Sequence, residues 1–423
     1  MAKHGARVSA MAEEMVGSAI LKVAGEIREL VAAGKEVCNL TVGDFAPSQF
    51  PVPELLASAT AQALQRGETN YPPSAGLPAL RSAVAQFYRE RLGLDYSAEQ
   101  ILITAGARPS IYAAFRVLLD AGDRVVCSVP AWNVPYYSYL VGAQLTPVEC
   151  TASTAFLPTR AMLEPHVRGA RLVTLNSPLN PAGTAFSATT LRAICELVVE
   201  ENERRGADER PLYLLYDQIY WLLTFHGLSH VNPVSLCPAV APYTVLIDGM
   251  SKHFAATGMR VGWAAAPADI LRSMSDFNGH VGAWAPRAEQ IASIALLQAP
   301  REIEAFHHTM VPKLQARLDA LYDGLCAMKQ AGLPVDAVPA MGGIYLSARF
   351  DLAGQRTPGG TRLQTNEDVR SYLLHSAGFA VVAFQAFGVS HETGWFRLSV
   401  GAVSMEQIEA VLPRLERALQ ALS

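Results

Sequence analysis

The chain has 423 residues, of which 50% are apolar, and a chain of this size and composition can bury one large hydrophobic core or two. Its 34 basic and 38 acidic residues leave a formal charge of -4, which argues against a protein that neutralises nucleic-acid phosphates. The six cysteines lie singly, without a C-x-x-C pair, and no apolar run is long enough for a membrane span. We therefore expect a compact cytoplasmic protein that binds neither nucleic acid nor a membrane.

Between residues 97 and 266, short apolar runs rich in β-branched residues alternate with helical patterns, which is typical of βαβ units around a parallel sheet. The predicted strands are residues 101–104, 124–129, 171–175, 212–216 and 244–247. None of these runs shows a regular polar alternation, as expected where helices cover both faces of a sheet. Pro109 in the first turn and Gly122 after the apolar pattern delimit the helix that follows the first strand.

After Ala299 the pattern changes, and long helical stretches enclose a few isolated strands. The elements predicted there are the helices 301–331 and 405–422, the strands 343–348 and 395–400, and an exposed loop over 352–365. We expect a large α/β domain, residues 51–299, with a mainly parallel sheet. The two chain ends, residues 1–50 and 300–423, are expected to form a smaller α+β domain.

Residues suited to binding or chemistry follow the predicted strands at the points where the strands end. They are Gly106, Ala107 and Arg108 after the first strand, Asn180 after the third, Asp217 and Tyr220 after the fourth, and Ser251 and Lys252 after the fifth. In an open parallel sheet, ligands bind beyond the carboxyl ends of the strands. Alone, Lys252 would be a solvated loop residue and Asp217 a helix cap. Their occurrence after successive strands favours a shared functional site.

The segment from Gly249 to Gly262 reads GMSKHFAATGMRVG and resembles the lysine-attachment pattern of class I/II aminotransferases, which are fold-type I enzymes dependent on pyridoxal 5'-phosphate (PLP). The likeness extends over nearly the whole chain, which resembles the aspartate aminotransferase type of this family. It implies that Lys252 holds PLP as a Schiff base and moves the Cα proton of the substrate. The implied reaction transfers an amino group between an L-amino acid and a 2-oxo acid.

The resemblance also implies the contacts of the cofactor. Asp217 would keep the pyridine nitrogen protonated, so that the ring accepts electrons, while Tyr220 and Asn180 would bond the phenolic oxygen. Trp132 would stack on the ring. The residues implied to hold the phosphate are Gly106, Ala107 and Arg108 at a helix N-terminus, together with Ser251 and Arg260.

Substrate and subunit contacts are implied in the same way. Arg397, in the sequence WFRLS, resembles the arginine that grips the substrate α-carboxylate, because a planar guanidinium meets a carboxylate in two parallel hydrogen bonds. Gly43 would add its backbone N–H there, beside Asn180. Tyr71, in NYPPSAG, resembles the tyrosine that reaches the phosphate of a neighbouring subunit, which implies a homodimer with shared active sites.

Some positions depart from the family pattern, and other functions stay open. Gly249, Ser177 and Ala182 stand where relatives usually have Ser, Asn and Thr, but none of these changes removes an essential group. A PLP lyase that eliminates a β-substituent or cleaves C–S bonds would carry the same lysine and cradle. A non-catalytic effector-binding module is the alternative from another class. No metal site is expected, because His307 and His308 point apart on a helix.

The sequence leaves the amino donor open. A dicarboxylic substrate needs a second cation in the site, for which Arg116 and Arg287 are available. Trp284 and Phe45 would instead shape a pocket for larger or apolar side chains. His253 has no assigned role, although it directly follows Lys252.

Overall fold

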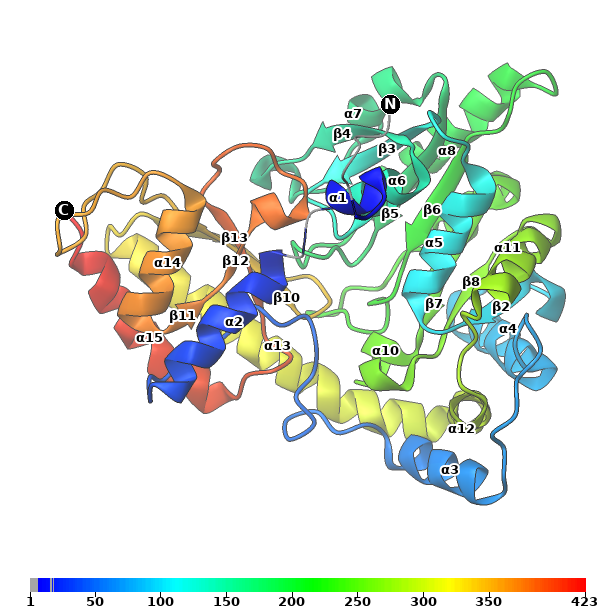
Figure 1. Ribbon diagram of the computed structural model, residues 1–423, viewed down its shortest axis with the longest axis horizontal. Coiled ribbons are helices and arrows are strands. Elements are labelled where there is room, and N and C mark those ends of the chain that lie inside the picture. The colour runs from blue at the N-terminus through cyan, green and yellow to red at the C-terminus, as the bar shows by residue number, and fades with distance from the viewer. Residues whose placement is uncertain (1–6, 16, 18) are drawn as a thin grey trace.

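The computed structural model describes residues 7–15, 17 and 19–423, and its largest feature is a seven-stranded sheet (Figure 1). The strands of this sheet are β2 (Ile101–Thr104), β3 (Arg124–Val129), β4 (Gln144–Glu149), β5 (Ala170–Asn176), β6 (Tyr213–Asp217), β7 (Thr244–Gly249) and β8 (Gly262–Ala265). They lie in the order β2-β8-β7-β6-β5-β3-β4, and β8 runs antiparallel to both its neighbours. The predicted α/β class with a mainly parallel sheet is thus confirmed.

Successive residues of these strands enter two different hydrophobic cores. Val125 and Val245 pack with α5, α6 and α11, whereas Val126 and Leu246 belong to the core on the opposite face, with α4, α7, α8 and α12. These helices are α4 (Pro78–Leu92), α5 (Ala107–Leu118), α6 (Val134–Val141), α7 (Arg160–Val167), α8 (Ala188–Arg205), α11 (Ala268–Val281) and α12 (Arg287–Leu297). Because both faces are covered, the strands carry no polar stripe.

Two strands of the large sheet were not predicted. β4 is an edge strand in which only Val148 is buried, so it lacks the continuous apolar run that marks the inner strands. β8 has only four residues and begins ten residues after Lys252. So short an apolar run next to a loop gives no clear strand pattern. The helix predicted to close at Gly122 ends at Leu118, and Gly122 instead forms a turn in which its N–H bonds the carbonyl of Gly142.

A second sheet is formed by residues late in the chain. Its strands are β9 (Val335–Val338), β10 (Tyr345–Phe350), β12 (Val382–Ala383) and β13 (Trp395–Ser399), in the antiparallel order β12-β13-β10-β9. Beside it, β1 (Cys38–Asn39) pairs in parallel with β11 (Phe379–Ala380), which brings the N-terminal segment against the C-terminal part. This pairing agrees with a unit made from both chain ends, but the domain limits at residues 50 and 300 stay a prediction.

Long helices surround the second sheet. They are α2 (Ala19–Ala32), α13 (Pro300–Gln330), α14 (Asn366–Ala377) and α15 (Met405–Gln420). In Figure 1, α13 extends from α12, beside the large sheet, to the strands and helices of the second sheet. The remaining helices are α1 (Ala10–Glu13), α3 (Glu54–Gln65), α9 (Pro233–Leu236) and α10 (Met250–His253), with short 3-10 turns at Ala98–Gln100, Ala152–Thr154, Pro238–Tyr243, Thr257–Met259 and Phe384–Phe387.

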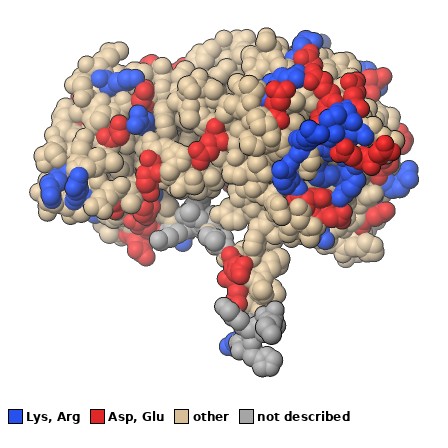
Figure 2. Space-filling model, turned by 90° about the horizontal axis from the view of Figure 1, so that it is seen from above, with Lys and Arg blue, Asp and Glu red and all other residues tan. Residues whose placement is uncertain are grey.

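The surface carries charges of both signs. Figure 2 shows basic and acidic side chains interspersed on one face of the molecule, and exposed ion pairs such as Arg160–Glu200 and Arg204–Glu209 are of this kind. Among the described residues, every helix is too short or too polar to cross a membrane.

Candidate active site

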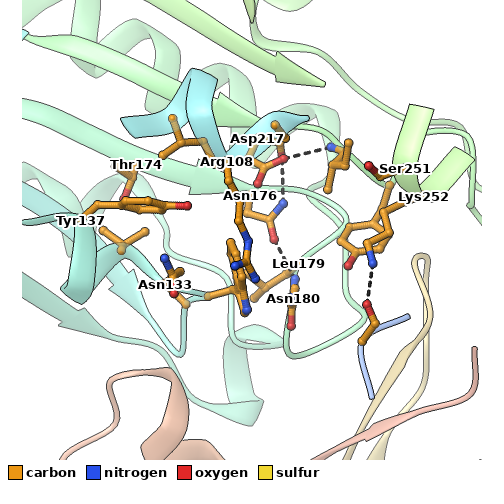
Figure 3. Close-up of a pocket in the computed structure, with 18 of the residues that line it drawn as sticks. Arg108, Asn133, Tyr137, Thr174, Asn176, Leu179, Asn180, Asp217, Ser251 and Lys252 are labelled. Carbon is orange, nitrogen blue, oxygen red and sulfur yellow. Dashed lines mark hydrogen bonds between the residues drawn. The ribbon is translucent and has the colours of Figure 1, made fainter. Parts of the chain in front are cut away.

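A cavity of about 750 Å³ lies at the carboxyl ends of β3, β5, β6 and β7, where these strands approach β10 and β13 (Figure 3). The predicted site residues that line it are Gly43, Ala107, Arg108, Trp132, Asn180, Asp217, Tyr220, Ser251, Lys252, Arg260 and Arg397. Gly106 is the N-cap of α5, directly before Ala107. The structure therefore brings together residues that are up to 354 positions apart in the sequence, from Gly43 to Arg397.

Lys252 lies in α10, the short helix that follows β7. Its Nζ donates a hydrogen bond of 2.5 Å to the carbonyl oxygen of Gly43 and lies 6.0 Å from the centre of the Tyr220 ring. Burial lowers the pKa of Lys252 to about 8; Asp44 opposes this shift, whereas Arg397 and other nearby arginines add to it. A lysine that is partly neutral near physiological pH can act as a nucleophile and as a base.

Asp217 is the last residue of β6 and lines the cavity. Its Oδ1 accepts a hydrogen bond of 3.0 Å from the Ile219 N–H. Burial raises the pKa of Asp217 to about 7; the Ile219 bond lowers it, and the carboxylate of Asp248 raises it further. Within the described residues, no basic side chain pairs with this carboxylate. It is therefore suited to a ligand that brings a protonated nitrogen.

One basic group, Arg260, and a helix N-terminus form an anion cradle. Arg260 donates to the carbonyl oxygens of Thr257 at 2.6 Å and Ala105 at 3.1 Å, which holds its guanidinium beside the first residues of α5. A Cβ on Gly262 would lie 2.4 Å from the carbonyl carbon of Gly106, so only glycine permits this close approach. Free N–H groups at a helix N-terminus and a guanidinium together suit a phosphate.

Arg397 forms a second cationic point in the cavity. It is 1% exposed, donates to Asn180 Oδ1 at 3.2 Å and to the Thr41 carbonyl at 2.6 Å, and lies between the rings of Tyr345 and Phe387. Its Nε has no hydrogen-bond partner among the described residues, and burial lowers the pKa of the guanidinium. A buried cation without a carboxylate partner is costly, so this position is suited to an anionic substrate group.

Arg108 and Trp132 form a third feature of the cavity wall. The Arg108 guanidinium carbon lies 4.4 Å from the centre of the Trp132 ring. The backbone of Arg108 belongs to the first turn of α5, but its charged end lies over the tryptophan. The side chain thus presents a cation to the cavity.

Comparison with known proteins agrees with this geometry. Residues 35–415 match the family model for aminotransferase class I and II. The chain belongs to this family. It is 31% identical over 411 residues to aspartate aminotransferases of Rhizobium meliloti strain 1021 and Geobacillus stearothermophilus, covering 96% of this chain and 94% and 96% of theirs. The solved aspartate aminotransferase of Rhizobium meliloti superposes with a TM-score of 0.89 at 29% identity, covering 99% and 100% of the two chains.

A second solved relative, the Thermus thermophilus aspartate aminotransferase with maleate, has a TM-score of 0.86 at 27% identity, covering 97% of this aminotransferase and 99% of that chain. The predictions of a fold-type I enzyme and of amino-group transfer are confirmed. The substrates are accordingly an amino acid and a 2-oxo acid. The lyase and the effector-binding module find no support among these relatives.

Some predicted residues lie outside the cavity of this aminotransferase. Tyr71 is 81% exposed, and its ring packs edge-on against Trp284 with 5.2 Å between ring centres. Neither Arg116 nor Arg287, suggested as second cations, lines the cavity, and Arg287 pairs instead with Glu68 at 2.6 Å. The sequence offered these two arginines as available cations without placing either one, and neither reaches the cavity of its own chain.

Several cavity residues were not singled out from the sequence. They are Asp44, Asn133, Tyr137, Thr174, Asn176, Thr257 and Tyr345. Asn176 could have been found, since it directly follows a predicted strand. Tyr345 gave no signal, because it stands in an apolar strand of the second sheet. Within the described residues, no group of three His, Cys, Asp or Glu could hold a metal ion.

His253, left unassigned by the sequence, points away from the cavity into a buried polar cluster. Its Nε2 lies 2.6 Å from Asp248 Oδ1, and neither side chain is exposed. The other oxygen of Asp248 accepts hydrogen bonds from Tyr88 and from the Trp221 indole. Asp248 lies before Lys252 in the sequence and His253 directly after it. Their contact therefore links the end of β7 to the end of α10 and fixes the turn that carries Lys252.

Replacing His253 by Leu is expected to destabilise the fold by about 2–4 kcal/mol, because Asp248 loses its closest side-chain partner in a buried environment. Urea unfolding of the cofactor-free protein measures this change. His308→Leu, on an exposed position, is the control and should change stability by less than about 0.5 kcal/mol. Equal stability of the two variants would contradict a supporting role for the His253 contact.

Proposed function

We propose that this aminotransferase carries PLP covalently linked to Lys252 and acts on dicarboxylic amino acids such as L-aspartate. The observation that carries the proposal is the charge arrangement of one cavity. Among the described residues, Lys252, with a pKa of about 8, lies near arginines that have no carboxylate partner, and Asp217 is a buried carboxylate without a basic partner. The names of the relatives support the substrate class, as does the cation of Arg108, which forms no ion pair within the described part of the chain.

The residues of the cavity fit the parts of PLP. Arg260 and the N-terminus of α5 would hold the phosphate, with Ser251 beside them, and Asp217 would face the pyridine nitrogen. Tyr220 and Asn180 would contact the phenolic oxygen, and the face of Trp132 would cover the ring. When bound, PLP supplies an aldehyde that joins the lysine and a protonated ring that accepts electrons from the substrate Cα.

The chain's own groups then account for substrate handling. Arg397 would bind the α-carboxylate, with the Gly43 N–H beside it, which places the substrate Cα near Nζ of Lys252. Lys252 would remove the Cα proton of the substrate and return it to the cofactor carbon that carried the aldehyde. A neutral amine near pH 8 is a competent base for both transfers. Arg108 would bind the second carboxylate of the substrate, a role that the sequence did not suggest.

Arg397→Lys is expected to raise KM for the amino donor by about 10- to 100-fold, although the charge is kept. An ammonium cannot replace a bidentate guanidinium, and a charge-assisted hydrogen bond contributes about 1.5–3 kcal/mol. Steady-state kinetics with aspartate and glutamate would measure the effect. Arg349→Lys, at a half-buried position that does not line the cavity, serves as a control. An unchanged KM for both donors would count against the assigned role.

We also propose a homodimer, because Tyr71 projects 81% exposed from the chain and cannot reach its own cavity in this arrangement. In a dimer its hydroxyl would contact the phosphate bound by the neighbouring subunit.

A cytoplasmic location is also part of the proposal. The six cysteines are free thiols, which is consistent with a reducing compartment.

Tyr71→Phe is therefore expected to weaken PLP binding by about tenfold while the molecular mass in solution stays that of a dimer. Equilibrium dialysis and sedimentation measure the two quantities. The matched control is Tyr243→Phe, at a position away from the cavity. A monomer in the wild-type protein would rule out the shared site.

One experiment tests the proposed function. The PLP-loaded protein is given single amino donors, including aspartate, glutamate, alanine and phenylalanine, without any 2-oxo acid. A transaminase consumes one equivalent of donor, releases one equivalent of 2-oxo acid and loses its visible absorbance. Continuous release of ammonia and pyruvate would instead indicate a lyase, and preference for phenylalanine over aspartate would contradict the dicarboxylic class.

A further inference from the structure

The hydroxyl groups of Tyr220 and Tyr345 lie 2.8 Å apart at the wall of the cavity. Tyr220 follows β6 of the large sheet, whereas Tyr345 begins β10 of the second sheet, so this hydrogen bond joins the two sheets. Tyr345 is 1% exposed and lines the cavity. This buried, ionisable side chain has no role in the proposed function.

The position of Tyr345 is fixed from several sides. Its ring centre lies 4.7 Å from the guanidinium carbon of Arg397. A Cβ on Gly43 would lie 2.7 Å from its hydroxyl, and a Cβ on Gly183 would lie 2.0 Å from its carbonyl oxygen. Both glycines therefore permit close contact with this tyrosine, and its hydroxyl and ring are held between Tyr220 and Arg397.

The charges around the pair favour one direction for the hydrogen bond. Of two hydroxyls in contact, the more acidic is the better donor. Burial raises the pKa of both tyrosines, but the pKa of Tyr220 lies well above its usual value, and contact with Tyr345 contributes to that rise. Arg397 lowers the pKa of Tyr345 and is the strongest effect opposing burial there. Tyr345 is thus the better donor of the two.

We propose that Tyr345 is a positioning residue whose hydroxyl donates to Tyr220 and whose ring carries the guanidinium of Arg397. The O–H of Tyr220 is then free to donate into the cavity. The inference rests on the proposed function, in which Tyr220 meets the cofactor's phenolic oxygen and Arg397 the substrate carboxylate. One side chain of the second sheet thus orients both binding groups. The ionisable groups that face Tyr345 from the packed elements are Tyr220, Arg397, Asp44 and Asp217.

The first test separates the hydroxyl from the ring. Tyr345→Phe keeps the ring but removes the donor, so Tyr220 becomes a weaker donor to the phenolic oxygen. That oxygen then holds the proton of the lysine-linked nitrogen more tightly, and the pH midpoint of the visible absorbance of PLP-loaded protein should rise by about 0.3–1 unit. The reading is spectroscopic and needs no turnover. An unchanged midpoint overturns the role of the hydroxyl.

A double-mutant cycle shows whether the effect passes through Tyr220. Tyr220→Phe should raise the midpoint at least as much as Tyr345→Phe, and the double variant should equal Tyr220→Phe alone. A further shift in the double variant means that Tyr345 acts by another route and contradicts the proposal. A general loss of structure would lower the unfolding temperature of both single variants without producing this non-additive pattern.

The second test addresses the ring. Dissociation constants are measured by absorbance with three non-reactive acids, acetate, maleate and 3-phenylpropionate, and the tightest is used for comparison. Tyr345→Leu should weaken its binding about threefold to tenfold, because the guanidinium loses its aromatic support, while Tyr345→Phe should change it little. Equal binding by both variants overturns the role of the ring. If Tyr345→Leu does not fold, the Phe variant and the double-mutant cycle decide.

Failure of this inference is distinct from failure of the proposed function. If wild-type protein shows no pH-dependent visible band, or Lys252→Ala keeps one, the proposed cofactor linkage itself is wrong. If wild-type protein titrates normally and Tyr345→Phe titrates identically, only the assignment of Tyr345 falls.

Discussion

Lys252→Ala is expected to lower the transamination rate by about 10⁴-fold or more, the largest effect of any single change. The variant loses the nucleophile that holds the cofactor and the base that moves the Cα proton. Lys252 is the lysine that lines the cavity, and its pKa of about 8 is what a base near neutral pH requires. Single-turnover kinetics of PLP-loaded protein measures the loss.

Lys252→Arg is the matched variant for this prediction. It keeps a positive charge among the same neighbours, but a guanidinium neither condenses with an aldehyde nor deprotonates near pH 8. It should therefore be as inactive as Lys252→Ala. Substantial activity in either variant contradicts the role of the lysine, whereas added methylamine is expected to restore part of the activity of the alanine variant only.

Asp217→Asn is expected to lower kcat by about 10²- to 10⁴-fold with a smaller change in KM. An amide cannot keep the pyridine nitrogen protonated, so the ring accepts electrons poorly, while the substrate contacts at Arg397 stay in place. Burial favours the protonated form of the unpaired carboxyl, with a pKa near 7. A cationic ring nitrogen beside it would bring this pKa down, so Asp217 should release its proton on PLP binding just below about pH 7, where the carboxyl of the cofactor-free protein is still protonated.

Asp44→Asn is the control for this second prediction. Asp44 also lines the cavity, but its Oδ1 accepts hydrogen bonds from Thr257 and from the Phe45 N–H, and it lies with the N-terminal segment rather than at the end of β6. Its loss should reduce kcat by less than about tenfold. Equal losses in the two variants would show that the cavity needs negative charge in general and not at Asp217.

The inner strands could be predicted because both of their faces are buried. Strands β3, β5, β6 and β7 place successive residues in two cores and so read as continuous apolar runs. The edge strand β4 leaves all its residues but Val148 partly or fully exposed, and the two-residue strand β11 pairs with β1, about 340 positions away in the sequence. Pairing of that kind leaves no periodic signal in a single short segment.

The same difference holds at the site. Lys252, Asp217 and Asn180 follow strands whose carboxyl ends meet at one edge of a sheet, so topology alone predicted that they converge. The contact of Tyr345 with Tyr220 joins residues 125 positions apart in different sheets, and no local pattern encodes it. The burial of His253 beside Asp248 was also not predictable, because periodicity does not define the orientation of a four-residue helix.

Borohydride reduction of freshly purified, PLP-supplied protein tests the central claim most directly. Peptide mapping of the reduced protein should find one pyridoxyl group per chain, on the peptide that contains Lys252, and none in Lys252→Ala. A reduced protein without pyridoxyl label, or with the label on another lysine, would contradict the account.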